Sequence, residues 1–516
     1  MPSLNEILKD IWPKVRRKHL FPELPVPEFA QIKLQAAIDM RCKKICISEE
    51  FVADLSRKLE PNEIIEGLLD HAVSHYLYCP WDFETHLRLY AEAKKVLANK
   101  VITQRVTDAF MDVVANTRCI RQTESPLPKL YQNLEGDEVE RIVRALCQRI
   151  WGENLNAPDY EDVSQKLAFI PYLNRSRWLA SIRRFARLVQ PYLAADQKEA
   201  ALTGNSPLGC HDLKLYTRDE IEYGLKKLAK GKVAPSEFAE IIQDHEEEIS
   251  EVLGHDKTGI GHGPGRAGFA NVLYYMKLAE NYWLPLKKMP MESSGATYPH
   301  HHTPWEVGRP CRDIDPWTSF GKIMPGITQT WTREEGEIFG KEEKTPDCIV
   351  VIDSSSSMTD PKQALSYAVL GAGCACDAYL RNNAAVAVYN FSDASAGRRK
   401  ILPYSRQRHP LYESICLYLG GGTRLEVEDI ENLQSDCLPD IFLITDMQIN
   451  NLNSLIQYFN YCRNRITAVH IGENEHVHTF RDTMELRKDI GIYAVTKKED
   501  IPRIIIGKVR EFLYKI

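Results

Sequence analysis

Oxygen-bearing side chains follow an apolar run in the last third of the chain. The run from Cys348 to Ile352 has the length and character of a buried strand, and it ends at Asp353. Hydroxyls follow at Ser355 and Ser357, two and four residues after the aspartate. A buried parallel strand delivers its last side chain to the carboxyl edge of a sheet, where open α/β folds place their ligands. A carboxylate and hydroxyls in a tight loop are hard ligands, which suit Mg²⁺ or Mn²⁺ better than a soft metal.

The pattern Asp-x-Ser-x-Ser resembles the metal-ion-dependent adhesion site of von Willebrand factor A (VWA) domains. That family has a threonine in a later loop, and Thr423 matches it after three glycines. It also has an aspartate after a second apolar strand, and Asp446 matches that position. The resemblance implies that Asp353, Ser355 and Ser357 coordinate from the first loop, with Thr423 binding directly and Asp446 binding through water.

A simpler interpretation is that residues 353–357 form only a polar turn with helix-capping side chains. A lone turn would not account for Thr423 and Asp446 in their strand and loop contexts. We therefore expect a hard-cation site whose open coordination position takes an acidic side chain from a partner protein, because hydroxyl ligands leave much of the positive charge uncompensated.

A second constellation lies near the N-terminus. His71 and His75 are spaced four apart in a helical pattern that begins near Pro61, a residue suited to a first helical turn. Histidines at this spacing lie on the same face of a helix and can bind one cation, as in zinc peptidases. A later helical pattern carries Asp108, Asp112 and Asn116, also four apart. Asp112 is the best placed of these to supply a third zinc ligand.

Short strands, a His-x-x-x-His helix and a later acidic helix resemble the minimal core of the zincin (gluzincin-like) metallopeptidases. More narrowly, the chain resembles predicted metal-dependent peptidases joined to a C-terminal VWA domain. This resemblance implies Zn²⁺ at His71, His75 and Asp112. Cytoplasmic VWA proteins of this type are associated with MoxR-type AAA+ ATPases, so such an ATPase is the expected partner.

The chain departs from that family at the general base. The family has His-Glu-x-x-His, whereas this chain reads His71-Ala-Val-Ser-His75. The glutamate takes a proton from the zinc-bound water, and Ala72 cannot do so. Glu66 and Asp70 are close in sequence, but neither is placed to replace it. As written, the chain is therefore not expected to be proteolytic.

Alternatives remain open for this region. Ala72 fits a natural pseudo-peptidase, and it also fits a zinc metallopeptidase whose glutamate was replaced to silence it. In that second case the VWA domain would recruit a substrate or a regulator. His71 and His75 would instead be hydrogen-bonded core residues if no metal binds.

Composition excludes several classes of protein. The net charge is −6, so the overall charge is not expected to attract nucleic acid. No apolar run is long enough to span a bilayer. The start lacks a signal-peptide pattern, and the 13 cysteines have no CxxC pair. These features favour a cytoplasmic protein with free thiols.

The chain of 516 residues is too long for one core. We predict a zincin-like α+β domain over 1–135, a helical domain over 136–290, a linker over 291–346 that packs on the last domain, and a doubly wound, Rossmann-like α/β VWA domain over 347–516. Within the last domain, expected elements are strands at 348–353, 384–391, 441–445 and 466–471, a helix from Pro361 to about Asn382, and a terminal helix around 501–515. Short strands are expected near Ile32 and Leu34 and near Ile45 and Ile47.

Overall fold

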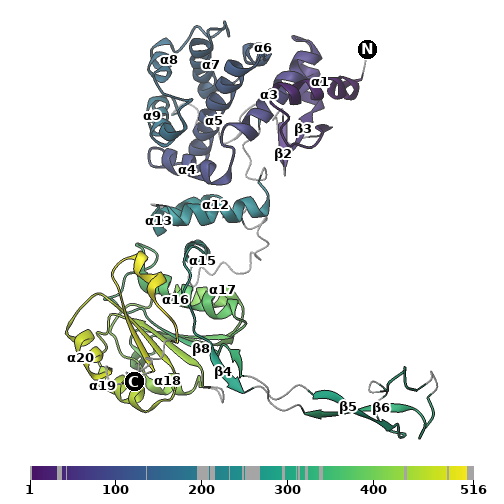
Figure 1. The fold of residues 1–516 in the computed structure, drawn as a ribbon. Helices are drawn as coiled ribbons and strands as arrows, with labels where there is room; N and C mark the ends of the chain where they lie inside the picture. Colours follow the sequence, from purple (N-terminus) through teal and green to yellow (C-terminus); the bar gives the residue numbers. More distant parts are fainter. Residues whose placement is uncertain are drawn as a thin grey trace, which may run out of the picture. The chain divides into compact units, whose positions relative to one another are not determined.

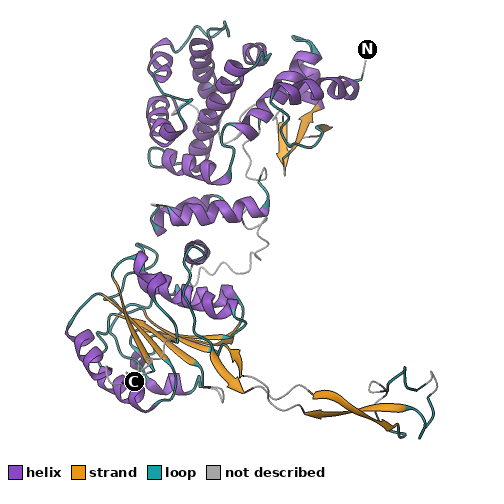
Figure 2. Ribbon diagram, in the orientation of Figure 1, coloured by secondary structure: helices purple, strands orange, loops and turns teal. Residues whose placement is uncertain are grey.

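The structure is a computed structural model. It contains a helical N-terminal part and a large mixed sheet in the C-terminal part (Figure 2). It describes residues 3–31, 38–41, 43–134, 136–193, 208–209, 216–231, 233–246, 249, 268–292, 297–309, 311, 314–319, 323–335, 341–434, 438–484, 487 and 489–507.

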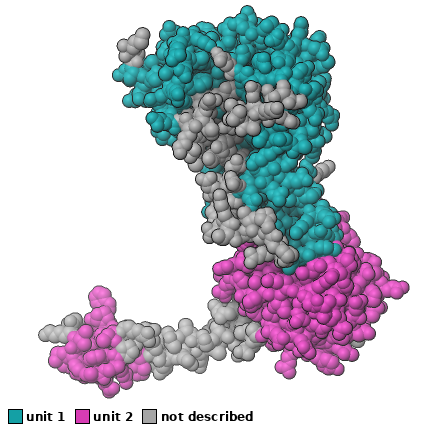
Figure 3. Space-filling model, turned by 180° about the vertical axis from the view of Figure 1, so that it is seen from behind, with its two compact units in different colours: residues 1–281, 359–366, 416–418 teal, residues 282–358, 367–415, 419–516 magenta. Residues whose placement is uncertain are grey.

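The chain forms two compact units (Figure 3). The first comprises residues 1–281 with the short segments 359–366 and 416–418. The second comprises residues 282–358, 367–415 and 419–516. The domain boundaries that we drew within each unit, near residues 135 and 346, stay predictions.

A small sheet lies at the start of the first unit. Its strands are β1 (Glu28–Ala30), β2 (Ile38–Arg41) and β3 (Lys44–Ser48), in the order β1-β3-β2. β3 is parallel to β1 and antiparallel to β2. The predicted strand near Ile45 and Ile47 is confirmed as β3, whereas Ile32 and Leu34 lie outside the described residues.

Helices make up the rest of the first unit (Figure 1). Their bounds are α1 (Leu4–Lys18), α2 (Glu49–Leu55), α3 (Pro61–Leu77), α4 (Phe83–Lys94), α5 (Lys100–Gln122), α6 (Leu127–Asn133), α7 (Glu138–Trp151), α8 (Glu161–Ala168), α9 (Trp178–Val189), α12 (Arg218–Lys230), α13 (Pro235–Asp244) and α15 (Phe269–Ala279).

Helices α3 and α5 form the centre of this unit. Pro61 opens α3 in its first turn, and the Asn99 side chain caps α5 by accepting from the backbone of Val101 and Ile102. α3 packs against α1, α5 and α6. Almost every side chain of α3 from Ile64 to His75 is buried, so its polar side chains need partners inside the protein.

The second unit is built on a six-stranded sheet in the order β10-β9-β8-β11-β12-β13. All neighbouring pairs are parallel except β10 with β9. Every residue of β8, β9 and β11 is buried, as expected for central parallel strands. The strand bounds are β8 (Cys348–Asp353), β9 (Val386–Phe391), β10 (Arg399–Ser405), β11 (Asp440–Thr445), β12 (Ile466–Ile471) and β13 (Ile490–Val495).

Helices cover both faces of this sheet. On one face α16 (Tyr367–Arg381) lies so close to β11 that a Cβ on Gly371 would meet Ile444 Cδ1 at 2.8 Å. On the other face Leu443 joins one core cluster with Leu455 and Phe480, which come from α19 (Leu452–Tyr461) and α20 (Glu475–Met484). A mostly parallel sheet between helical layers agrees with the α/β architecture predicted for this part of the chain.

The strand predictions in the second unit are confirmed to within two residues, but three other details are wrong or missing. The first helix begins at Tyr367 rather than Pro361, because residues 361–366 form turns in which Asp360 Oδ1 accepts from Lys362 N. Strands β10 and β13 were not predicted. Residues 498–503 form a short 3₁₀ helix and 504–507 are not helical, so the terminal helix is wrong where it can be compared.

The segment that we predicted as a linker contains strands. β4 (Met289–Glu292) pairs antiparallel with β7 (Lys341–Lys344), and β5 (Thr297–Pro304) pairs antiparallel with β6 (Gln329–Glu335). Its packing on the last domain stays a prediction. Among the described helices, none combines the length and the apolarity needed to cross a membrane.

Candidate metal centres

The carboxyl edge of the six-stranded sheet begins with Asp353. It is the last residue of β8, and it is 2% exposed. Ile352 pairs with Ile444 of the neighbouring parallel strand β11, so Asp353 and Thr445 reach the same edge of the sheet. The Thr445 hydroxyl donates to Asp353 Oδ2 at 2.7 Å. Sequence reasoning missed Thr445 as a positioning residue.

The first loop folds back on this aspartate. The backbone N–H of Ser355 donates to Asp353 Oδ1 at 2.9 Å. The hydroxyl oxygens of Ser355 and Ser357 are 3.1 Å apart, and Ser355 is buried while Ser357 is exposed. The predicted spacing therefore brings both hydroxyls together beside one carboxylate.

The loop that carries Thr423 is hydrogen-bonded to the first loop. Gly420 N donates to Ser354 O at 2.9 Å, and Ser356 donates to Gly421 O through its N–H at 3.1 Å and its hydroxyl at 2.8 Å. Gly421 has a φ of +100°, a region that other residues rarely adopt. Ser392, which follows β9, also donates to this loop.

The third loop carries Asp446, which is 6% exposed. Its Oδ1 accepts from Gln448 N at 2.9 Å, and Asn450 N donates to Thr423 O at 2.8 Å. Backbone hydrogen bonds therefore connect all three predicted loops at one edge of the sheet.

The charge of Asp446 acts on the neighbouring Asp353 carboxyl group. Burial raises the pKa of Asp353 to about 6, and the negative charge of Asp446 adds to that rise. Hydrogen bonds from Thr445 and Ser355 oppose it, because they stabilise the ionised carboxylate. Negative charge held in a buried position would be compensated by a divalent cation.

In the N-terminal unit the structure brings His71, His75 and Asp112 together. All three are buried, and one possible ligand atom from each lies within 4.8 Å of the others. His75 Nε2 is 3.0 Å from Asp112 Oδ1, and His71 Nε2 is 3.8 Å from the same oxygen. In a tetrahedral zinc site, ligand atoms about 2.0–2.2 Å from the ion lie roughly 3.3–3.6 Å apart, which these separations bracket.

The other nitrogen of each ring faces an oxygen. His75 Nδ1 is 2.7 Å from the Cys79 carbonyl oxygen, which can only accept, so Nδ1 carries the proton. His71 Nδ1 is 3.0 Å from Asn116 Oδ1, and Asn116 Nδ2 donates to the Tyr131 hydroxyl at 2.8 Å. This arrangement turns Nε2 of both rings towards Asp112. In metal-binding histidines, the ring nitrogen that does not bind the metal is typically held by a hydrogen bond in this way.

Position 72 holds only a buried methyl group. Asp70 does not replace a base there, because its carboxylate accepts from Lys18, His19 and Ser125. Glu66 also pairs with Lys18, at 2.9 Å. Both acids are therefore engaged in ion pairs or hydrogen bonds with these neighbours.

A small cavity of about 30 Å³ borders Asp112. Tyr131, Arg105 and Glu140 also line it, and Arg105 pairs with Glu140. Burial raises the pKa of Glu140 to about 7, against the opposing effect of Arg105. Burial also raises the pKa of Asp108, and the Asp112 charge adds to that rise, so Asp108 is held in its neutral form more readily than an exposed carboxyl.

Comparisons with known proteins add little. No family model and no curated protein matches the sequence. The crystal structure of the SpRpn10 VWA domain matches with 14% sequence identity and a TM-score of 0.25, over 31% of this chain and 93% of that chain. This likeness to a VWA domain is weak and carries no argument, so the sites are judged on their own geometry.

Proposed function

We propose that the C-terminal unit is a cation-dependent protein-binding module. In this proposal Mg²⁺ or Mn²⁺ is held by Asp353, Ser355, Ser357, Thr423 and Asp446. The observation that supports it best is the set of hydrogen bonds that joins three loops beside Asp353 and Asp446 at one edge of the sheet.

The chemistry of these side chains indicates the ligand. Hydroxyl oxygens bring no charge, so a site of one directly bound carboxylate and several hydroxyls leaves net positive charge on a dication. An acidic side chain from a partner protein both fills a coordination position and neutralises that charge. The partner is therefore expected to present an exposed aspartate or glutamate.

The N-terminal unit is proposed to be a zincin-like scaffold that binds Zn²⁺ but lacks the general base. Its buried His71, His75 and Asp112 suit the ion, while Ala72 cannot move a proton. A MoxR-type AAA+ ATPase remains the proposed partner, on family resemblance alone.

Binding of Mn²⁺ to the full chain tests the C-terminal site. Asp353→Asn keeps the shape of the side chain and removes its charge, so Mn²⁺ affinity at that site should fall at least tenfold by calorimetry. Asp360→Asn is the matched control, since Asp360 lies in the following turn and accepts only from Lys362 N among the described side-chain contacts. Equal affinity of the Asp353 variant and the wild type would refute the site.

The partner is tested separately. A MoxR-type ATPase should bind the wild-type chain in Mg²⁺ and be released by EDTA, and Asp353→Asn should not bind it. Binding that persists in EDTA would contradict the cation-dependent mode. Absence of binding, with Mn²⁺ affinity intact, would exclude only this partner.

A second candidate is a zinc metallopeptidase whose glutamate at position 72 has been replaced by alanine. The orientation of both histidine rings towards Asp112 favours it, because that geometry suits a zinc ion. Zinc would supply an acidified water, and a carboxylate at position 72 would accept its proton. Ala72→Glu should then hydrolyse an unstructured substrate, and a zinc-loaded Ala72→Glu protein without activity would refute this candidate.

A further inference from the structure

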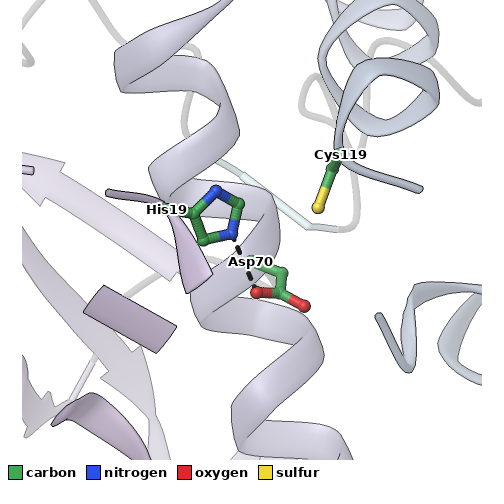
Figure 4. A group of neighbouring side chains, drawn as sticks. All are labelled: His19, Asp70 and Cys119. Carbon is green, nitrogen blue, oxygen red and sulfur yellow. Dashed lines mark hydrogen bonds and ion pairs between the residues drawn. The ribbon is translucent and has the colours of Figure 1, made fainter. Parts of the chain in front are cut away.

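A second buried cluster joins three elements of the N-terminal unit (Figure 4). His19 directly follows α1, Asp70 lies on α3, and Cys119 lies on α5. They are 3%, 0% and 0% exposed. One possible ligand atom from each residue lies within 4.8 Å of the others, as is also true of His71, His75 and Asp112.

The contacts of His19 are the first argument that this cluster is a site. Its Nε2 lies 3.0 Å from Asp70 Oδ1. Its Nδ1 is buried, and within the described part of the chain it has no hydrogen-bond partner. Because leaving a buried nitrogen without a hydrogen bond is destabilising, such an atom requires an explanation.

The contacts of Asp70 leave one oxygen facing the cluster. Lys18 and Ser125 donate to Oδ2, at 2.7 Å and 2.5 Å, whereas Oδ1 faces His19. Lys18 also pairs with Glu66 at 2.9 Å, so its charge is shared with a second carboxylate. The ammonium group therefore neutralises only part of the negative charge of this region.

Cys119 supplies a donor of a different kind. Its sulfur lies 3.4 Å from Thr123 Oγ1, one turn along the same helix, and it also interacts with the His19 ring. In Figure 4 its sulfur lies beside His19 and Asp70. Thiolate, imidazole and carboxylate together form a ligand set for a borderline or soft dication, and hard Mg²⁺ and Ca²⁺ do not favour it.

We propose that His19, Asp70 and Cys119 form a second transition-metal site, suited to Zn²⁺, that is separate from the site at His71, His75 and Asp112. The ion would take one ring nitrogen, one Asp70 oxygen and the Cys119 sulfur, with the fourth tetrahedral position open to water or a hydroxyl. The thiol proton is released when the sulfur binds. The thiolate and the carboxylate then place two negative charges beside the two positive charges of the dication.

The role of such an ion follows from the elements that it would join. It would tie the end of α1 to α3 and α5, the two helices that carry His71, His75 and Asp112. We therefore assign the ion a structural role, because it would hold three separate elements together and so stabilise their packing.

Co²⁺ is the probe that separates this site from the others. Thiolate binding to Co²⁺ produces a near-ultraviolet charge-transfer band, and neither the histidine-carboxylate site nor the rim of the six-stranded sheet contains a proposed sulfur ligand. The full chain is stripped of metal, supplied with excess Mg²⁺ to fill the hard-cation site, and titrated with Co²⁺ under reducing conditions. The wild type should show the band.

Variants identify the residues that give rise to the charge-transfer band. Cys119→Ser and His19→Gln should abolish it, and each should lose about one equivalent of bound Co²⁺. Cys147→Ser is the matched control, because Cys147 is a fully buried free thiol on α7 outside this cluster, and it should retain the band. Replacing both His71 and His75 by alanine should retain the band while losing a different equivalent, so failure of the two sites can be distinguished.

Thermal unfolding shows whether each variant is folded. Zn²⁺ should raise the Tm of the wild type and of Cys147→Ser but should shift that of Cys119→Ser less. A wild-type protein without the band, or a Cys119→Ser protein that keeps it, would overturn the proposal. The cluster would then be a buried ion-pair network of Lys18, His19 and Asp70.

Discussion

Replacement of Thr445 by valine tests the electrostatic account of the sheet edge. The substitution keeps the branched shape of the side chain and removes the hydroxyl that donates to Asp353 Oδ2 at 2.7 Å. Both residues are buried, at 0% and 2% exposure, so water cannot readily take the place of the lost donor.

The size of the effect follows from the strength of that hydrogen bond. A hydrogen bond to a charged group contributes about 1.5–3 kcal/mol, and about 1.4 kcal/mol corresponds to a tenfold change in a proton equilibrium. The bond favours the ionised carboxylate, so its loss favours the protonated form. The pKa of Asp353, which is about 6 in the metal-free protein, should therefore rise to about 7 or above.

Cation binding requires the ionised carboxylate, so the shift becomes a pH dependence. Wild-type affinity for Mn²⁺ should be constant above about pH 7 and fall about tenfold per pH unit below about pH 6. In Thr445→Val the same decline should begin about one pH unit higher. At pH 6.5 the variant should therefore bind Mn²⁺ roughly three- to tenfold more weakly, and the difference should narrow above pH 8.

Calorimetric titration with Mn²⁺ at several pH values between about 5.5 and 8.5 measures this profile. Thr445→Ser is the control, because it keeps the donor and should follow the wild-type curve. Identical profiles for the wild type and the valine variant would show that Thr445 does not act through Asp353. A wild-type profile that is flat down to pH 5.5 would refute the raised pKa itself.

Three further perturbations have definite expected outcomes. Asn116→Leu removes the acceptor that orients the His71 ring, so Zn²⁺ affinity should fall about tenfold to a hundredfold in a competition titration with a chelator, with His75 contacts unchanged. Arg465→Met leaves the buried Asp440 carboxylate without its bidentate partner, so the free energy of unfolding in urea should fall by about 3–5 kcal/mol. In the metal-free wild type the raised pKa of Asp353 means that the folded state binds the proton more tightly. The stability from this group is present below about pH 4 and is lost as pH rises through about 6, by about 3 kcal/mol, which equilibrium unfolding at each pH measures.

Much of the sheet edge could be predicted because its signal is local in sequence. An apolar run that ends in Asp353, with hydroxyls at Ser355 and Ser357, specifies both a strand and the loop that follows it. Thr445 was missed because its role depends on the register between β8 and β11, which no local pattern reveals.

The N-terminal clusters show the same limit. His71 and His75 were identified from helical spacing, and Asp112 from the spacing of Asp108, Asp112 and Asn116 in a later helical pattern. His19 and Cys119 carry no such pattern. His19 is 51 residues from Asp70 in sequence, so only the packing of α1 and α5 on α3 brings this set together.

The position of β10 at the edge of the sheet explains why it was not predicted. β10 is exposed along much of its length, contains Pro403, and has a register irregularity between Leu402 and Ser405. Proline is tolerated at a sheet edge but weakens the strand pattern in the sequence. The helix after β8 was placed too early because turn residues 361–366 share the composition of a helix start.

The near-complete burial of α3 between Ile64 and His75 limits which sequence changes this protein can tolerate. Each residue added to a helix rotates everything beyond it by about 100°. A single insertion or deletion between Ile64 and Asp70 would therefore swing Asp70, His71 and His75 away from their partners together. Both constellations would be lost in one step, whereas point substitutions could remove either one alone. A descendant that has discarded only one of them should still carry this helix at its original length.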